Sequence, residues 1–285
     1  VLQVPITTGL RSGGSLTYTF TVANVGTLAT PVGIWFDRAV LSTDPVMDSN
    51  DLPLDLQQHT GVLAPGASYR RTNTVTLPDG ISGSFHLIVK TDFTDTVNEF
   101  LLEGDNETAT ENPLAIQRAD YPDLVIEGLQ LTGPAGQNYS VNWSTFNRGT
   151  ASTLARFKER VRVRHLTTAT TLLERIFTNA SSLAVNASIP RQVQFAASQP
   201  GQYLIEVATD IGQEIYEYDA VSHDSAENNV VTTGFGITAV FTVVVNASPA
   251  NAGTVTGGGA FPQGSSVTVT AVPITTQAPY QFLHW

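Results

Sequence analysis

The sequence contains no cysteine, and charged residues make up only 14% of its 285 positions. Without cysteine, no disulfide can stabilise a fold and no thiol can act as a nucleophile, so stability has to come from packed cores. A run of about 18 apolar residues is also missing, so we expect no membrane insertion of this chain. Helical periodicity is nowhere sustained, which argues against a helical protein.

What the sequence does contain is typical of short strands separated by turns. Hydrophobic residues make up 41% of the chain, which also has 23 glycines and 15 prolines. Apolar and polar residues alternate along Leu16, Tyr18, Phe20 and Val22, which predicts a strand with one buried face. Similar strands recur between turn signals along most of the chain. We therefore predict an all-β fold with tandem immunoglobulin-like β-sandwiches of about seven strands each, plus a small C-terminal β module.

Two segments of the chain occur twice. Residues 17–27, which contain Asn-x-Gly-Thr, return at residues 140–150, and Asn147 follows Asn24 by 123 positions. Residues 83–92 return at residues 201–210, a shift of 118 positions. Two nearly equal shifts indicate tandem copies of one domain that differ in loop length. We predict three domains, at residues 1–117, 118–234 and 235–285.

The repeated motifs resemble a known family. They are Asn-x-Gly-Thr at a strand end, Leu63-Ala-Pro-Gly66, a Gly-x-Tyr/Phe strand that ends in Asp with Glu seven residues later, and a terminal Asn-Asn or Asp-Asn. Together they resemble the CARDB domain, the cell-adhesion-related domain found in bacteria, and residues 121–125 resemble its opening strand. The second copy departs from the family by lacking a clear Pro-Gly. The resemblance implies immunoglobulin-like domains of large bacterial or archaeal surface proteins, without catalytic residues.

The last residues of the chain resemble a different family. Residues 241–249, the glycines at 257–259 and the Phe-x-x-Trp at 282–285 are similar to the divergent InlB B-repeat, a small β module of bacterial surface proteins. The similarity stops before the closing strands of that family. We therefore expect a partial InlB B-repeat-like module with exposed strand edges at residues 235–285.

Charge is distributed unevenly along the chain. Counting Lys and Arg against Asp and Glu, residues 1–117 carry a net charge of −8, residues 118–234 carry −3, and the remainder carries none. An acidic protein attracts cations and repels nucleic acid. We therefore expect no nucleic-acid partner, and calcium as the one cofactor to consider.

Two groups of carboxylates are candidate calcium ligands. The first is an acidic loop of the first copy, and the second consists of paired residues at the end of each copy, because calcium prefers six to eight oxygen ligands. The alternative is that these side chains cap turns by accepting hydrogen bonds from nearby backbone amides. The loop residues are Asp44, Asp48, Asn50, Asp51 and Asp55. The paired residues are Asp92, Glu99 and Asp105 in the first copy, and Asp210, Glu217 and Glu227 in the second.

Every second residue of one segment in the second copy is basic. A strand would place these side chains on one face, successive ones about 6.6 Å apart, while Phe157, Val161 and Val163 point into the core. Such a face could bind an anionic glycan, or the acidic first copy of a neighbouring molecule or surface domain. The alternative is an exposed face that Arg and Lys protect from aggregation. The basic residues are Arg156, Lys158, Arg160, Arg162 and Arg164.

Residues with catalytic chemistry do not form a recognisable constellation in this sequence. His223, Asp224 and Ser225 are adjacent, and adjacent residues cannot adopt triad geometry. We therefore expect no enzymatic activity. Our leading hypothesis is a non-catalytic segment of a large bacterial extracellular protein, acting as a spacer, an adhesive stalk or a filament subunit that contacts other copies of itself. The alternative is a carbohydrate-binding or substrate-presenting region of a secreted hydrolase.

Overall fold

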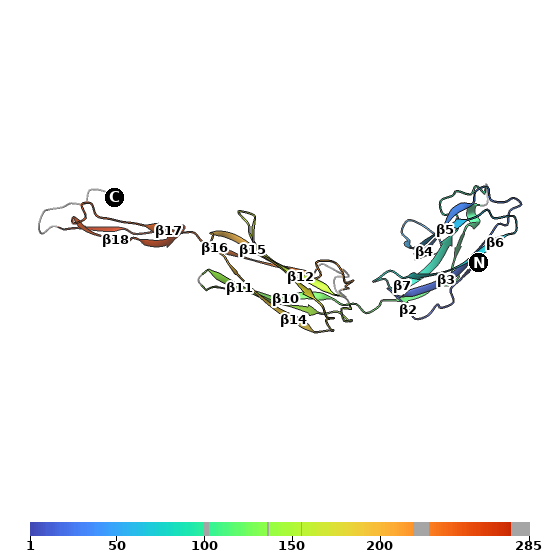
Figure 1. Cartoon of the computed structure of the whole chain (residues 1–285), viewed down its shortest axis with the longest axis horizontal. Coiled ribbons are helices and arrows are strands. Elements are labelled where there is room, and N and C mark those ends of the chain that lie inside the picture. Colours follow the sequence, from blue (N-terminus) through green and yellow to red (C-terminus); the bar gives the residue numbers. More distant parts are fainter. Residues whose placement is uncertain (100–102, 136, 155, 219–227, 275–285) are drawn as a thin grey trace. The chain divides into compact units, whose positions relative to one another are not determined.

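The computed structural model describes residues 1–99, 103–135, 137–154, 156–218 and 228–274. The chain divides into two compact units, Val1–Asp120 and Tyr121–Trp285. Strands joined by turns build both units (Figure 1), with one short 3-10 turn, η1, at Glu103–Asp105. The prediction of an all-β fold is therefore confirmed. In the part of the chain that the structure describes, no helix is long and apolar enough to cross a membrane.

The first unit is a sandwich of two sheets. One sheet has the strand order β1-β3-β6, and the other has the order β2-β9-β7-β4-β5, with β8 also paired to β7. Neighbouring strands are antiparallel except for β2 and β9, which are parallel. The strands are β1 (Leu2–Gln3), β2 (Leu10–Arg11), β3 (Ser15–Ala23), β4 (Ile34–Ser42), β5 (Leu52–Thr60), β6 (Ser68–Thr76), β7 (Gly83–Lys90), β8 (Glu107–Ala109) and β9 (Leu114–Gln117).

The core of the first unit lies between its two sheets. Leu16, Tyr18 and Phe20 of β3 are buried, as their alternation with threonines predicts, and they pack with residues of the opposite sheet such as Leu41 and Leu87. Burial of one such side chain stabilises a fold by about 1.5–3 kcal/mol. A cysteine-free sandwich of this size can therefore rely on its core.

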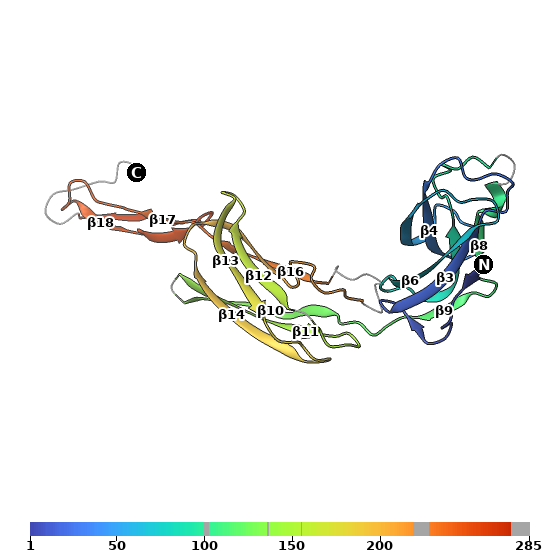
Figure 2. The same ribbon diagram turned by 45° about the vertical axis from the view of Figure 1, so that its right-hand side comes forward.

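The second unit contains a sandwich with the same arrangement of strands. Its sheets have the orders β10-β11-β14 and β13-β12-β15-β16, which match β1-β3-β6 and β5-β4-β7-β9 of the first unit. Figure 2 shows β10, β11 and β14 running together as one layer. The strands are β10 (Leu124–Ala135), β11 (Asn138–Asn147), β12 (Phe157–His165), β13 (Thr170–Asn179), β14 (Ser188–Ala196), β15 (Gly201–Ala208) and β16 (Val230–Ile237).

The core of the second sandwich again uses both sheets. Val141 and Trp143 of β11 pack against Val161, Ile205 and Val207 of the opposite sheet. The limits of this sandwich differ slightly from the sequence expectation. The second unit begins at residue 121 rather than 118, and β16 continues through residue 237 because it pairs with β15 along its whole length, past the expected limit at 234.

The remaining described residues form two separate pairs of strands. β17 (Val240–Val243) pairs with β19 (Gly259–Pro262), and β18 (Gly253–Thr256) pairs with β20 (Thr270–Pro273). Val240, Phe241, Val244 and Val272 are more than half exposed. A pair of strands alone is marginally stable in water. The Phe-x-x-Trp motif at 282–285 lies outside the described residues.

Candidate functional site

Asn147 connects the loops at one end of the second sandwich. The side chain is fully buried at the end of β11. Its Oδ1 accepts hydrogen bonds from the backbone amides of Asp123 and Gly149, both at 3.1 Å. Its Nδ2 donates to the carbonyl oxygens of Ala151 at 2.8 Å and Leu183 at 2.9 Å. One side chain therefore holds two loops and the residue that precedes β10.

Asn24 is the equivalent residue of the first sandwich, and its side chain makes three hydrogen bonds instead of four. Its Oδ1 accepts a hydrogen bond from the Gly26 amide at 2.9 Å, and its Nδ2 donates to the carbonyls of Leu28 and Leu63 at 2.8 Å. The repeated Asn-x-Gly-Thr motif is thus a loop clamp. An Asn is required because the site needs an acceptor and two donors on one short side chain.

Asp92 and Asp210 are turn caps. Each carboxylate accepts hydrogen bonds from the backbone amides four and five residues later in the chain. The donor–acceptor distances are 2.7–2.9 Å for Asp92 and 3.0–3.1 Å for Asp210. Both residues have a positive φ, of 43° and 40°, which Asp tolerates better than most residues. The geometry therefore favours the turn-capping interpretation of these two carboxylates.

Glu217 is a buried carboxyl group that holds the start of β10. One carboxylate oxygen accepts a hydrogen bond from the Leu124 amide at 2.6 Å, and the other accepts from Asn229 Nδ2 at 3.0 Å. Burial raises the pKa of Glu217 to about 8, and the nearby Asp210 and Asp123 add to the effect. Near neutral pH the group can therefore exchange a proton.

The acidic loop of the first unit is held by its own carboxylates. Asp44 accepts a hydrogen bond from the Val46 amide, Asp48 from the Asn50 amide, and Asp51 from the Asp48 amide, over 2.7–2.9 Å. Asp55 lies on β5 rather than in the loop, because the strand already begins at residue 52. Its carboxylate accepts hydrogen bonds from Tyr18 and Asn73.

The paired end-of-domain residues are only partly brought together. Asp92, Glu99 and Asp105 line one groove of the first unit. In the second unit, Glu227, along with the His-Asp-Ser run at 223–225, lies outside the described residues. Within the described ranges, no three His, Cys, Asp or Glu side chains form a group that could hold a metal ion.

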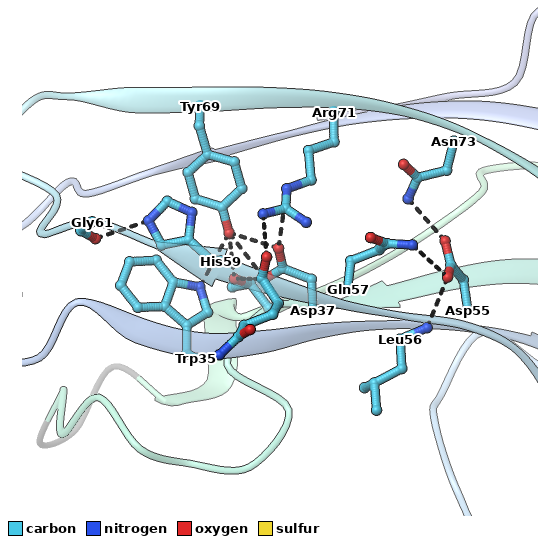
Figure 3. A network of polar contacts seen from close by, with 12 residues as sticks. Trp35, Asp37, Asp55, Leu56, Gln57, His59, Gly61, Tyr69, Arg71 and Asn73 are labelled. Carbon is cyan, nitrogen blue, oxygen red and sulfur yellow. Dashed lines mark hydrogen bonds and ion pairs between the residues drawn. The ribbon is translucent and has the colours of Figure 1, made fainter.

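A buried carboxylate also lies at the centre of a polar network in the first sandwich (Figure 3). Asp37 on β4 is 2% exposed, and it accepts hydrogen bonds from Tyr69 at 2.8 Å and Thr91 at 2.6 Å. The His59 ring is stacked between Trp35 and Tyr69, with centroid distances of 3.9 and 4.2 Å. Burial raises the pKa of Tyr69 far above its ordinary range, and the charge of Asp37 contributes. Tyr69 therefore remains a neutral hydrogen-bond donor.

The second sandwich has a corresponding network around Glu159. This carboxylate on β12 is fully buried. It accepts hydrogen bonds from Arg191 at 2.7 and 3.0 Å, from Asn179 at 2.8 Å and from the Thr145 hydroxyl. The contacts tie β12 to β11, β13 and β14, so the network joins the two sheets.

Sequence reasoning missed these two carboxylates. A signal was present for Glu159, because it lies on the same side of the alternation as Phe157 and Val161, which are fully buried as predicted. Nothing in the local sequence identifies Arg191 as its partner, since the two residues are 32 positions apart.

The basic segment forms β12 as predicted, but glutamates compensate part of its charge. Arg160 and Arg162 both contact Glu206 of the neighbouring strand, at 2.8 and 3.0 Å, and Lys158 contacts Glu214 at 3.3 Å. Arg156 precedes the strand, and in the part of the chain that the structure describes neither it nor Arg164 forms an ion pair. The basic residues without an ion pair among the described residues therefore lie at the two ends of the segment.

The outer face of β11 and β14 contains a shallow hollow of about 590 Å³. Asn142, Phe146 and Gln192 line it. Arg148 lies over the Phe146 ring at 4.2 Å and forms an ion pair with Glu127 at 2.8 Å. The hollow thus combines an aromatic ring with amide groups.

Several solved structures are similar to parts of this chain. The CARDB domain of a Pyrococcus furiosus protein, solved in complex with di-metal ions, is 20% identical over 41% of this chain and 88% of that domain, with a TM-score of 0.31. The solution structure of the same domain is 19% identical over 41% of this chain and 96% of that chain, with a TM-score of 0.30. Red sea bream transglutaminase is 11% identical over 82% of this chain and 31% of that chain, with a TM-score of 0.29.

At such TM-scores the likenesses do not bear on what this chain binds or does. No family model matches the chain. No curated protein matches it either.

Proposed function

We propose that this chain is a non-catalytic structural segment of a large bacterial extracellular protein, where it acts as a spacer, an adhesive stalk or a filament subunit. The observation that carries the proposal is the recurrence of one sandwich design. Apart from β2 and β8 of the first sandwich, the strand order is the same in both sandwiches, and Asn24 and Asn147 clamp equivalent loops. Repeated domains with clamped loop ends suit a role in which length and rigidity are the function.

Surface labelling tests this proposal directly. Antibodies raised against residues 1–120 should label intact cells that produce the protein, without permeabilisation. A cytoplasmic protein of the same cells serves as the control and should stay unlabelled. Labelling that requires permeabilised cells would contradict an extracellular role.

The basic segment of the second sandwich supports a contact with an anionic partner. We infer that the partner is the acidic first sandwich of another copy, which carries a net charge of −8 over residues 1–117. The uncompensated Arg156 and Arg164 are the residues best placed to make this contact. Charge complementarity of this kind sets orientation and association rate more than affinity.

The hollow on β11 and β14 favours carbohydrate binding as a second candidate function. Sugars bind to sites that combine an aromatic ring with amide hydrogen-bonding groups, and Phe146, Asn142 and Gln192 supply these. A glycan array tests the idea. Binding that is lost in Asn142→Ala and Gln192→Ala, but kept in Asn50→Ala, would support it, whereas no binding to any glycan would exclude this role for the hollow.

A further inference from the structure

Glu159 is the centre of a group of polar side chains that lie together inside the second sandwich. One of its carboxylate oxygens accepts a hydrogen bond from the Thr145 hydroxyl, and the other accepts from the side-chain amide of Asn179 at 2.8 Å. Thr145 and Glu159 are fully buried, and Asn179 is 7% exposed. The shared carboxylate therefore places a hydroxyl next to a carboxamide, and the surrounding core keeps water away from both.

Arg191 completes this group. Its guanidinium donates to the side-chain carbonyl oxygen of Asn179 at 2.5 Å and to Glu159 at 2.7 Å. It therefore polarises the carboxamide, and it lies where negative charge would develop if a nucleophile attacked Asn179 Cγ. A buried ion pair adds little net stability to a fold. A hydroxyl, a carboxylate base and a donor to a carbonyl oxygen are, in contrast, the components of acyl transfer.

The first sandwich has a buried carboxylate at the equivalent position, Asp37, but neither of the two reacting groups. Two residues before the clamping asparagine, β3 has Val22 where β11 has Thr145. Opposite the first buried residue of the central strand, β5 has His59 where β13 has Asn179. The combination of hydroxyl, carboxylate and carboxamide is thus a feature of the second sandwich, and the first sandwich serves as an internal control.

We propose that Thr145 and Asn179 form an intramolecular ester crosslink. Thr145 Oγ1 attacks Asn179 Cγ while Glu159 takes the hydroxyl proton, and Arg191 stabilises the oxyanion that forms on Asn179 Oδ1. Glu159 then gives the proton to Asn179 Nδ2, the C–N bond breaks, and ammonia leaves. One ester C–O bond thereby replaces one amide C–N bond, and no other reactant is needed.

The crosslink joins the two sheets of the sandwich, because Thr145 lies on β11 and Asn179 ends β13. Exclusion of water from the site protects the ester from hydrolysis. Amides are poor acyl donors, so the reaction is slow, and freshly prepared protein is in the hydrogen-bonded form. The reaction depends only on the second sandwich and is independent of where the protein acts.

Mass spectrometry of the whole chain, fresh and after several days at neutral pH, tests the proposal. We expect the aged protein to lose the mass of one ammonia. Protease digestion should then give a peptide containing Thr145 linked to a peptide containing Asn179, and no linked peptides from the first sandwich. Glu159→Gln removes the base and should slow the loss of ammonia by at least about a hundredfold.

Variants of Thr145 separate this reaction from ordinary deamidation, in which a backbone nitrogen attacks the side chain of Asn179 and ammonia is also lost. Thr145→Ser keeps a hydroxyl and should still give the linked peptides, whereas Thr145→Val should not. Thr178→Val, on an exposed threonine of β13, is a matched control and should react as the parent does. The proposal is overturned if the aged parent keeps its ammonia or gives no linked peptides. It also fails if Thr145→Val loses ammonia as fast as the parent.

Discussion

Single residues matter most where a charge lies inside the second sandwich. Arg191 donates two hydrogen bonds to the fully buried carboxylate of Glu159. Removing the arginine alone leaves a buried charge without its main partner, and such changes cost about 3–5 kcal/mol. We expect Arg191→Met to lower the unfolding free energy by that amount in urea denaturation, followed by the fluorescence of Trp143.

The double variant Glu159→Leu with Arg191→Met should recover most of that loss. Replacing both members of a buried pair by apolar groups is often neutral. Arg156→Met is a matched control on an exposed arginine and should stay within about 0.5 kcal/mol of the parent. A single Arg191→Met variant as stable as the parent would show that the ion pair does not support the fold.

Glu217 should make the second sandwich sensitive to pH. Its pKa is about 8 in the folded protein and 4.5 in the unfolded chain, so the folded state binds more protons between these values. Unfolding free energy therefore falls as pH rises through this window, by up to about 1.4 kcal/mol per pH unit, and it levels off above the folded pKa. Denaturation at a series of pH values from 5 to 9 measures the slope.

Glu217→Gln should flatten this pH dependence without loss of contacts. Among the described residues, Asn229 Oδ1 has no hydrogen-bond partner. The new Gln can accept from the Leu124 amide and, after rotation of the Asn229 amide, donate to that oxygen. If the unfolding free energy of the variant depends on pH as steeply as that of the parent, a group other than Glu217 causes the pH dependence.

At the scale of elements, β12 carries the candidate contact for assembly. Arg162 lies between Glu206, 3.0 Å away, and Glu174, its register partner on β13. Acidic substitutions here would place like charges together and destabilise the sheet. Gln keeps the length and polarity, so Arg156→Gln with Arg164→Gln is the better test. We expect the parent to associate at low salt in light scattering and the double Gln variant to remain monomeric.

Salt and a second variant control that experiment. Contacts between exposed charges weaken as ionic strength rises, so parent association should disappear at about 1 M salt, where the Debye length is about 3 Å. Arg118→Gln changes the charge by one unit outside β12 and should leave association intact. A parent that is monomeric at low salt would support the alternative interpretation, in which the basic face only protects the sheet.

The turns that end β7 and β15 should be stable without metal. Asp92 and Asp210 each accept hydrogen bonds from two backbone amides. The net contribution of one such hydrogen bond to the unfolding free energy is about 0.5–1.5 kcal/mol. We expect Asp92→Ala and Asp210→Ala to be destabilising to a similar extent in calcium and in chelator. A ligand at 100 times its dissociation constant adds about 2.7 kcal/mol. A parent that melts several degrees higher in calcium would therefore restore the metal interpretation.

At the scale of the whole molecule, the two units should unfold separately. Each sandwich has its own core, so pulling on the chain ends should give two distinct unfolding events. Asn24→Ala should weaken one event and Asn147→Ala the other, the second more strongly because Asn147 is fully buried and makes four hydrogen bonds. Gln194→Ala, on an exposed side chain, should weaken neither. A single unfolding event would contradict independent domains.

The features that the sequence determines by itself are those that depend on near neighbours along the chain. The alternation of Leu16, Tyr18 and Phe20 specifies a strand with one buried face, because successive side chains point to opposite faces. The return of the Asn24 motif at Asn147, 123 positions later, locates the second copy of the sandwich. Both interpretations of Asp92 could also be stated in advance, because its hydrogen bonds reach only four and five residues ahead.

Contacts between distant strands were decided only by the tertiary structure. Glu159 meets Arg191 across two sheets, and Asp55 meets Tyr18 37 positions away. Compensation of Arg160 by Glu206 depends on the register of β12 and β15. Local patterns fix which face of a strand is buried, but packing selects which distant residues meet there.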